Sequence, residues 1–379
     1  MSLGPGSGYG DAAEAYLHGL RSAGVSVTWT PLGWPSNRWD APLGPVANVD
    51  LGSAAHRDIA DRPIDHHAVV VCSPPFWHDQ LAVETAGRLL VAYTTWETDR
   101  VPADWPAILN RYDRVLVPSE FNAAVFARSG VSAPITVIPH IARRDQPAGA
   151  GSRSPARSGF VFYMISTWTT RKAILDAVRA YVDAFTADDD VMLVIHTTAT
   201  DRIAEARLTR RGAPAGSHAC ATWFTLAQAL AGTDRLPRIT LSTRWLAPAE
   251  VDELHARGDC FLSLSRGEGW GLGAFDAAAF GNPVIVTGWG GTLDFLPGGY
   301  PYCVDYELVP TLTEEPDSWW HPQPKERWAR ASIDHAAKLL RHVYDHRDEA
   351  RSWGHVLQAH VQATFDAADI TGRLIAALE

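Results

Sequence analysis

Glu268 is the one carboxylate inside a loop that contains four glycines, at positions 267, 269, 271 and 273. The loop follows an apolar run, residues 260–264, and leads into a helix of small residues that continues to Phe280. At such a junction the free backbone N–H groups and the helix dipole favour a phosphate. A carboxylate beside a phosphate site is suited to accept hydrogen bonds from hydroxyls, such as those of a sugar. The simpler alternative is a charge that complements the helix dipole.

Arg171 and Lys172 are adjacent cations between an expected strand, residues 159–165, and an amphipathic helix, residues 173–185. Arginine binds a phosphate through two N–H groups and lysine acts as a compact charge, so the pair suits a diphosphate. The alternative is an exposed basic helix start, which would place two positive charges at the positive end of the helix dipole. We therefore expect Arg171 and Lys172 to bind a diphosphate.

Two further acids have positions that suit a ligand site. Asp276 lies eight residues after Glu268 within the helix, where it is either a ligand-binding residue or an ordinary solvated acid. Glu97 and Trp96 follow the expected strand 88–93. They therefore lie at the carboxyl edge of a sheet, where parallel sheets bind ligands.

Short strands rich in Val, Ile and Leu alternate with helical segments along the chain, which is the pattern of parallel, doubly wound sheets. In the first half we expect strands at 25–30, 67–72, 88–93, 114–118 and 135–139. In the second half we expect them at 159–165, 191–196, 238–242, 259–263, 283–287 and 302–304. Because 379 residues exceed what one core usually organises, we predict an α/β protein with two Rossmann-like domains.

Hydrophobic residues make up 46% of the chain and charged residues 20%, which indicates a soluble globular protein. The net charge of −10 argues against general nucleic-acid binding. The apolar runs are too short for a membrane span and the first residues do not resemble a signal peptide, although peripheral membrane contact stays open. The cysteines have no metal-binding spacing and indicate reduced thiols in a cytoplasmic protein, at positions 72, 220, 260 and 303.

The segment Ser265 to Val284 resembles the hallmark of the retaining nucleotide-sugar glycosyltransferases of family four, which have the GT-B fold. That hallmark is Glu, seven residues, Glu, in a setting like Ser-Arg-Gly-Glu-Gly-Phe-Gly-Leu-Pro-x-x-Glu-Ala-Met-Ala-x-Gly-x-Pro-Val. Here Asp276 replaces the second Glu and Gly273 replaces the usual proline. The resemblance implies two Rossmann-like, doubly wound parallel-sheet domains that face each other across a cleft. It also implies that Glu268 contacts the donor sugar and that Asp276 binds the nucleotide ribose.

The same resemblance implies further donor-binding residues. Arg171 and Lys172 correspond to the cations that neutralise the leaving diphosphate in family members, with Thr167 nearby. His196 and Arg244 end strands beside the expected cleft, at positions that can flank the nucleotide base. The backbone groups that follow Glu268 complete the expected donor site, at Gly269, Trp270, Gly271 and Leu272.

In the first half, Trp96 to Trp105 and Asp113 to Phe121 resemble a Trp-Glu-x-Asp run and an Asp-x-Val-x-Val-Pro-Ser-x-Phe run of relatives. Many family members place a histidine that contacts the donor sugar near this strand end, where this chain has Thr95 or Trp96. Glu97 is a candidate substitute, and a buried structural acid is the alternative. The expected acceptor or cleft loops contain Gly8, Tyr9, Gly10, Trp96, Gly290 and Gly291.

The glycine-rich segment 6–10 begins without the strand that precedes it in relatives, so either the chain is truncated or the sheet does without that strand. We expect an acceptor-binding domain at residues 1–145 and a donor-binding domain at residues 146–356. The linker between them is expected at Gln146 to Ser158, which is rich in Gly, Ser and Pro. The last helix, about residues 357–379, is expected to pack back on the first domain.

The resemblance implies a hexosyltransferase that moves a sugar from a nucleoside diphosphate sugar to an acceptor hydroxyl, with retention of anomeric configuration. Arg171 and Lys172 would replace a metal ion. No further cofactor is implied, the acceptor is a carbohydrate or natural product, and the donor base stays open. The alternative is a catalytically weakened GT-B homologue that binds sugar nucleotides or regulates a partner, in view of Asp276, the absent histidine and the absent first strand.

Overall fold

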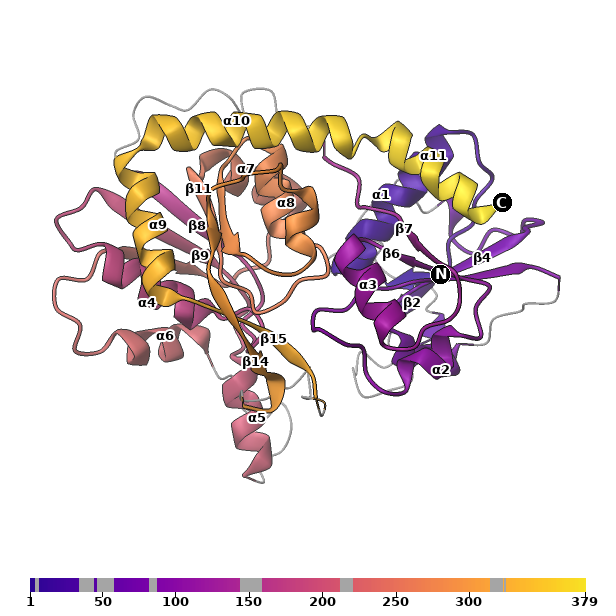
Figure 1. The fold of residues 1–379 in the computed structure, drawn as a ribbon, viewed down its shortest axis with the longest axis horizontal. Coiled ribbons are helices and arrows are strands. Elements are labelled where there is room, and N and C mark those ends of the chain that lie inside the picture. The colour runs from indigo at the N-terminus through magenta and orange to yellow at the C-terminus, as the bar shows by residue number, and fades with distance from the viewer. Residues whose placement is uncertain are drawn as a thin grey trace. The chain divides into compact units, whose positions relative to one another are not determined.

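The computed structural model describes residues 1–3, 7–33, 44–45, 58–81, 87–143, 159–211, 221–313, 323 and 325–379. Its contacts divide the chain into two compact units (Figure 1). The first comprises Met1–Trp96, Arg100–Ala142 and Phe365–Glu379, and the second comprises Glu97–Asp99 and Arg143–Thr364. Residues 357–364, which were expected to pack on the first domain, belong to the second unit. The expected linker, Gln146–Ser158, lies outside the described residues.

Within the described residues, the first unit contains a seven-stranded sheet in the order β3-β2-β1-β4-β5-β6-β7. Its strands are β1 Ser2–Leu3, β2 Pro31–Gly33, β3 Gly44–Pro45, β4 Ala68–Cys72, β5 Leu89–Tyr93, β6 Arg114–Val117 and β7 Ile135–Val137. The neighbouring strands are parallel except β2 and β3. Its helices are α1 Gly8–Ser22, α2 Trp105–Leu109, α3 Glu120–Arg128, α11 Ala367–Leu378 and the 3-10 helix η2 Pro75–Gln80.

Strand β1 corrects the expectation that the glycine-rich segment lacks a preceding strand. It lies between β2 and β4, with Ser2 paired to Pro31 on one side and to Cys72 on the other. Two residues are too few for the alternating pattern that identifies a strand in a sequence. The helix that follows, α1, begins inside the glycine-rich segment at Gly8, because Ser7 Oγ accepts a hydrogen bond from Gly10 N at 3.0 Å and caps the helix.

The strand expected at residues 25–30 is wrong. The backbone of Trp29 forms an isolated bridge to Ala60, through hydrogen bonds with Ile59 and Asp61. The sheet strand β2 starts after this bridge, at Pro31. A run of apolar and β-branched residues predicts an extended backbone, but it does not reveal which of these residues join the sheet.

The second unit contains, within the described residues, a six-stranded parallel sheet in the order β10-β9-β8-β11-β12-β13. Its strands are β8 Phe160–Ile165, β9 Val191–His196, β10 Arg238–Ser242, β11 Cys260–Ser263, β12 Val284–Thr287 and β13 Cys303–Val304. Its helices are α4 Ile174–Ala184, α5 Arg202–Arg210, α6 Thr222–Leu230, α7 Pro248–Arg257, α8 Leu272–Ala279, α9 Ile333–Asp345, α10 Arg347–Thr364 and the 3-10 helices η3 Gly291–Phe295 and η4 Thr311–Thr313. The third strand of the unit lies at one edge and the sixth at the other, so the direction of strand addition reverses between β8 and β11.

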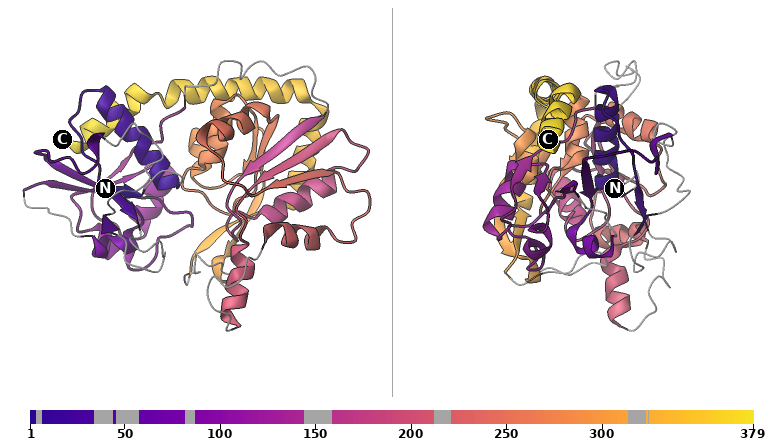
Figure 2. Two further views of the ribbon diagram at one scale, coloured as in Figure 1. Left: turned by 180° about the vertical axis from the view of Figure 1, so that it is seen from behind. Right: turned by 90° about the vertical axis from the view of Figure 1, so that its right-hand side faces the viewer.

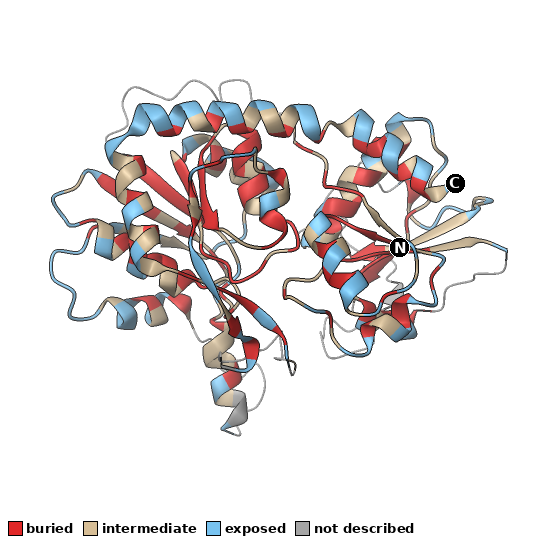
Figure 3. Cartoon of the chain, in the orientation of Figure 1, coloured by how far each residue is buried: buried red, intermediate tan, exposed pale blue. Residues whose placement is uncertain are grey.

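Small side chains allow close packing around this sheet. Residues Ala277, Ala278 and Ala279 of α8 have no exposed surface, and the helix contacts β11, β12 and α10. The long helix α10, yellow in Figure 2, runs beside α8 in the second unit. Figure 3 shows that the central strands of both sheets are buried, as expected when helices cover both faces of a parallel sheet.

An antiparallel pair of strands, β14 Tyr306–Pro310 and β15 Arg327–Ala331, extends from the second unit. Trp328 of β15 is fully buried. Cys72 and Cys260 are buried free thiols and Cys303 is half-buried, whereas Cys220 lies outside the described residues. In the described part of the chain, no helix is both long and apolar enough to cross a membrane.

Candidate functional site

The carboxyl ends of β8 and β11 border the point where the order of the second sheet reverses. The turn Ser166–Ala173 follows β8, and the loop Leu264–Gly271 follows β11. In doubly wound sheets this point opens a crevice in which ligands bind. The turn carries Arg171 and Lys172, and the loop carries Glu268, so local sequence patterns place all three side chains at one position of the sheet.

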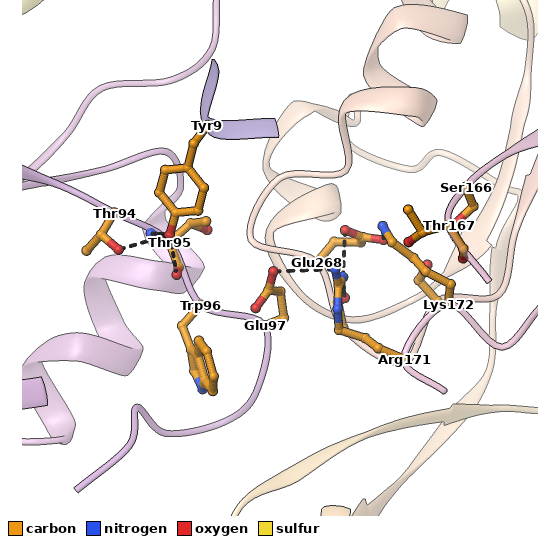
Figure 4. A network of polar contacts seen from close by, with 12 residues as sticks. Tyr9, Thr94, Thr95, Trp96, Glu97, Ser166, Thr167, Arg171, Lys172 and Glu268 are labelled. Carbon is orange, nitrogen blue, oxygen red and sulfur yellow. Dashed lines mark hydrogen bonds and ion pairs between the residues drawn. The ribbon is translucent and has the colours of Figure 1, made fainter. Parts of the chain in front are cut away.

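Arg171 and Lys172 converge on the Glu268 carboxylate (Figure 4). Lys172 Nζ donates to Glu268 Oε1 at 2.5 Å and Arg171 Nη1 donates to Glu268 Oε2 at 3.1 Å. Arg171 Nη2 lies 3.5 Å from Glu97 Oε1, so the guanidinium bridges two carboxylates. The four side chains are 15–25% exposed, and solvent therefore screens this cluster less than an ion pair on an open surface.

The cluster moves the pKa values of its two carboxyl groups in opposite directions. Burial raises the pKa of Glu268, but Lys172 and Arg171 together lower it more, to about 2. Burial raises the pKa of Glu97 above its ordinary value, although Arg171 opposes this effect. Glu268 therefore stays ionised and can accept hydrogen bonds, whereas Glu97 is more readily protonated than an ordinary glutamate.

The carboxylate of Glu268 does not fully offset the cost of burying the positive charge of Lys172. Burial lowers the pKa of Lys172, Glu268 raises it, and Arg171 lowers it again, with a net decrease. A diphosphate that enters the cluster brings further negative charge and so favours protonated Lys172. The pair Arg171 and Lys172 can therefore bind an anion while Glu268 remains ionised.

Arg266 holds the turn that carries the two cations, and the sequence did not indicate this role. Its backbone N donates to Arg171 O at 2.8 Å, its Nε donates to Thr170 O at 3.3 Å, and its Nη2 donates to Asp176 Oδ2 at 3.1 Å. The guanidinium also lies 5.7 Å from the ring centroid of Trp328. Only 10% of the Arg266 side chain is exposed, so it faces the protein rather than a ligand.

Glycines permit the close backbone contacts of the site. A Cβ atom at Gly267 would lie 1.8 Å from the carbonyl oxygen of Glu97, so this approach requires glycine. Gly271 precedes α8 with a φ of 93°, and a Cβ there would lie 2.6 Å from Thr292 Oγ1. In the loop expected to reach the cleft, Gly290 precedes Gly291, whose N donates to Glu268 O at 2.8 Å. This loop thus supports the backbone of Glu268.

Of the loop residues expected to bind the donor, some can offer only their backbone to a ligand, and Trp270 has its side chain in the core. The ring of Trp270 is buried and packs against Phe275 and Phe295, with centroid distances of 5.2 and 5.6 Å. Its side chain therefore belongs to the core, and the backbone of Gly269 to Gly271 is what this loop can offer a ligand. Leu272 is the first residue of α8 and is half-buried.

The remaining donor candidates lie at strand ends of the second unit. Thr167 is exposed and lies with Ser166 on the Lys172 side of the cluster (Figure 4). His196 is the last residue of β9, and its pKa is lowered by burial and then by Arg244. Arg244 Nη1 lies 2.5 Å from Glu250 Oε1, in an exposed pair.

Asp276 lies in the second half of α8, where it contacts a residue outside the Glu268 cluster. Its Oδ2 is 3.8 Å from Nη1 of Arg143, and the same nitrogen lies 2.8 Å from Asp252 Oδ1. The Asp276 side chain is 20% exposed. Spacing along the helix indicated Asp276 as a candidate site residue, but it did not reveal the contact with Arg143.

In the first unit, the expected cleft residues form a separate polar network. Gly8 and Gly10 lie in the first turn of α1, and Tyr9 Oη is 3.0 Å from Thr94 Oγ1 and accepts from Thr95 N at 3.2 Å (Figure 4). Trp96 packs edge-on against Trp105 at a centroid distance of 4.6 Å. Tyr9 thus joins the start of α1 to the segment that follows β5.

Two more residues near the cluster were missed. Ser265 donates a hydrogen bond that helps lower the pKa of Glu268, and its place inside the family motif was a signal that could have indicated it. Asp99 lies two residues after Glu97, and its Oδ1 accepts from Arg327 N at 2.7 Å. No local pattern could have indicated that contact, because the two residues are far apart in the sequence.

Two doubly wound α/β units, with a cation pair and a carboxylate where the second sheet reverses, define the GT-B class of fold. A family model described as "Family 4 Glycosyltransferase in conflict systems" matches residues 116–369. The match covers more than half of the chain, and the protein therefore belongs to this family.

Known relatives agree with this assignment. The GDP-mannose:cellobiosyl-diphosphopolyprenol alpha-mannosyltransferase of Xanthomonas campestris is 24% identical over 258 residues, which cover 64% of this chain and 59% of the relative. The structure of Anabaena HepE in complex with UDP and glucose has a TM-score of 0.55 at 13% identity, over 82% of this chain and 77% of HepE. A trehalose 6-phosphate synthase from Burkholderia multivorans has a TM-score of 0.53 at 12% identity, over 77% of this chain and 66% of its own. At these identities the two structures show that the fold is shared.

Proposed function

We propose that this protein transfers a hexose from a nucleoside diphosphate sugar to an acceptor hydroxyl, with retention of the anomeric configuration. The observation that carries the proposal is the convergence of Arg171 and Lys172 on Glu268 at the reversal point of the second sheet. Membership of the family supports the same reaction.

In the proposed reaction, the bond between the anomeric carbon and the diphosphate oxygen breaks while the acceptor oxygen bonds to the same carbon. The proton of the acceptor hydroxyl passes to the leaving diphosphate. When the acceptor attacks from the face that the diphosphate leaves, the configuration is retained without a protein nucleophile. Arg171 and Lys172 stabilise the negative charge that builds on the diphosphate, which is the electrostatic contribution that usually dominates such steps.

The two carboxyl groups have different proposed roles. Glu268 accepts hydrogen bonds from hydroxyls of the donor sugar, because its low pKa keeps it ionised. Glu97 lies on the other side of Arg171 and takes the place of the sugar-contacting histidine of relatives. Because Arg171 and Lys172 supply two positive charges for the diphosphate, we propose that the reaction needs no divalent ion.

We further propose that the second unit binds the donor and the first unit binds the acceptor. Thr167, His196, Arg244 and the backbone of Gly269 to Gly271 would complete the donor site. Gly8, Tyr9, Gly10 and Trp96 would face the acceptor, as would the loop with Gly290 and Gly291. The names of the relatives include GDP-mannose and UDP, so both bases are candidates for the donor.

A weakened, ligand-binding homologue remains the second candidate because Asp276 pairs with Arg143. If Asp276 marks a decayed ribose site, Asp276→Glu should raise transfer strongly. If Asp276 already serves the reaction, Asp276→Glu should change transfer little.

A thermal-shift panel with UDP, GDP, ADP and dTDP tests the proposal on the wild type and on Arg171→Ala. We expect one nucleotide, at about one hundred times its dissociation constant, to stabilise the wild type by about 2.7 kcal/mol. Arg171→Ala should lose this stabilisation. The matching sugar nucleotide is then incubated with candidate acceptors in the presence and absence of EDTA, and NMR reports the anomeric configuration of the product. The absence of any nucleotide-dependent shift in the wild type would overturn the proposal.

A further inference from the structure

The outer edge of β15 contacts both segments that carry the carboxyl groups of the site. Asp99 N donates to Arg327 O at 2.9 Å, and Arg327 N donates to Asp99 Oδ1 at 2.7 Å. Ala329 lies two residues after Arg327 on the same strand, and its N donates to Arg266 O at 2.8 Å. Glu97 lies two residues before Asp99 and Glu268 lies two residues after Arg266.

The strand register explains why Arg327 and Ala329 have outward-facing backbone groups. In an antiparallel pair, successive residues alternate between hydrogen bonding to the partner strand and pointing away from it. Arg327 is paired with Pro310, which has no N–H, and Ala329 is paired with Leu308. Residues 327 and 329 therefore point their N–H and C=O groups away from β14, toward Asp99 and Arg266.

Trp328, between these two residues, anchors the strand. Its side chain is fully buried and its ring lies 5.7 Å from the Arg266 guanidinium. Arg266 in turn holds Arg171 and Thr170 through its backbone and side-chain N–H groups. The strand β15 is therefore joined to the cation turn as well as to both carboxylate segments.

The division of the chain into units agrees with this connection. Glu97–Asp99 belong to the second unit, although Trp96 and Arg100 on either side belong to the first. The close approach at Gly267 brings the backbone of Glu97 directly against the Glu268 loop. The segment Glu97–Asp99 is therefore packed against β15 and the Glu268 loop, in a different unit from its sequence neighbours.

We propose that Asp99 is a positioning residue, which binds the outer edge of β15 and thereby holds Glu97 against Arg171 at a fixed spacing from Glu268. Two residues of a strand span about 6.6–6.8 Å, and this length separates the points at which β15 holds the two segments. Arg171 fits between the carboxyl groups, 3.5 Å from Glu97 and 3.1 Å from Glu268. The inference rests on the proposed glycosyl transfer, since it assigns the geometry of that site.

The test compares Asp99→Ala with Asp99→Asn, in which the amide oxygen can still accept from Arg327 N–H. For each variant, kcat and KM with the sugar nucleotide and the dissociation constant of the nucleoside diphosphate are measured. Asp99→Ala should lower kcat about 10-fold to 100-fold, because small misplacements of a reacting group have effects of this size. The dissociation constant should change less than about twofold, since Arg171 and Lys172 remain. Asp99→Asn should retain most of the activity.

Glu307→Ala is the matched control, because this side chain lies on β14 and is 66% exposed in a pair with Arg330. Glu307→Ala should leave kcat, KM and the dissociation constant unchanged. A second comparison covers the case in which Asp99→Ala fails to fold. Arg327→Pro removes the N–H that Asp99 accepts, whereas Arg327→Ala keeps it, so only the proline variant should lose turnover.

Unchanged kcat in Asp99→Ala and Arg327→Pro would overturn the inference, provided that the wild type binds the nucleoside diphosphate. Equal losses in Asp99→Asn and Asp99→Ala would also overturn it, because charge rather than the hydrogen bond would then be responsible. A parallel loss of nucleotide affinity would indicate a general structural role and contradict a positioning role. Failure of the wild type to bind any nucleotide would instead overturn the proposed function.

Discussion

Replacing Lys172 with methionine removes one of the two cations at Glu268 and keeps a side chain of similar length. Lys172 Nζ lies 2.5 Å from Glu268 Oε1, while Arg171 stays 3.1 Å from Oε2. The Lys172 and Glu268 side chains are 19% and 15% exposed, so solvent replaces only part of the lost interaction. We therefore expect both folding stability and diphosphate affinity to fall.

The pKa of Glu268 sets the size of the stability change. A pKa of about 2 instead of 4.5 corresponds to about 3 kcal/mol, shared mainly between Lys172 and Arg171. This stabilisation is complete above about pH 4.5 and is lost as the pH falls through about 2. Because methionine also removes the cost of burying the Lys172 charge, we expect a net loss of about 1 kcal/mol at neutral pH.

The effect on binding should be larger than the effect on stability. A hydrogen bond between charged groups contributes about 1.5–3 kcal/mol, which corresponds to a 10-fold to 150-fold change in dissociation constant. Calorimetric titration with the nucleoside diphosphate and with the free nucleoside separates phosphate recognition from base recognition. Only the diphosphate should bind more weakly to Lys172→Met.

Arg179→Met is the matched control for this experiment. Arg179 lies on the same helix, α4, and its side chain is 63% exposed in a pair with Asp176. It should bind both ligands as the wild type does. Diphosphate affinity in Lys172→Met within about twofold of the wild type would refute the assignment of Lys172 to the diphosphate. A similar loss for the free nucleoside would also refute it.

Three further outcomes are expected. Burial raises the pKa of Glu97, so ionisation of Glu97 destabilises the fold above that raised pKa and has no cost below pH 4.5. Glu97→Gln should therefore raise the melting temperature near pH 8 but not near pH 4, and it should lower turnover. An equal shift of the melting temperature at both pH values would contradict this. Burial lowers the pKa of His255 to about 3, so the stability that comes from its neutral ring is complete above pH 6.5 and is lost as the pH falls toward 3. The melting temperature of His255→Phe should therefore depend less on pH over this range. An unchanged pH dependence would exclude His255 as a cause of the acid destabilisation. Gly271→Ala should lower the free energy of unfolding, measured by urea denaturation, by about 1–2 kcal/mol, because the backbone φ of 93° at residue 271 is unfavourable for alanine. A wild-type free energy of unfolding would show that the loop adjusts without strain.

Local sequence patterns were sufficient to predict the fold class and most strands. Strand β9 was predicted at the residues where it occurs, and β8, β11 and β12 begin one residue later than predicted. These strands are apolar because helices cover both faces of the sheet, and that composition is visible in the sequence. The position of glycines and charges directly after such strands also predicted that Arg171, Lys172 and Glu268 lie at one edge of the sheet.

Contacts between distant residues could not be predicted in this way. Strand β1 has two residues, and its place in the sheet depends on hydrogen bonds to β2 and β4 rather than on its own pattern. Asp276 occupies the position at which the family resemblance implies a ribose-binding residue, but its contact with Arg143 depends on how a distant segment reaches α8. Trp270 lies inside the loop motif, yet its ring fills a core that Phe295 helps to form.

The sequence by itself therefore determined which loops contain the candidate site residues, because strand and helix periodicity are local properties. Tertiary structure decided how those side chains are arranged. Glu97 lies beside Arg171 because Asp99 binds the edge of β15, more than two hundred residues later in the chain. Such a contact depends on the register of β15 with β14 and on the burial of Trp328, and neither has a signature in the residues around Glu97.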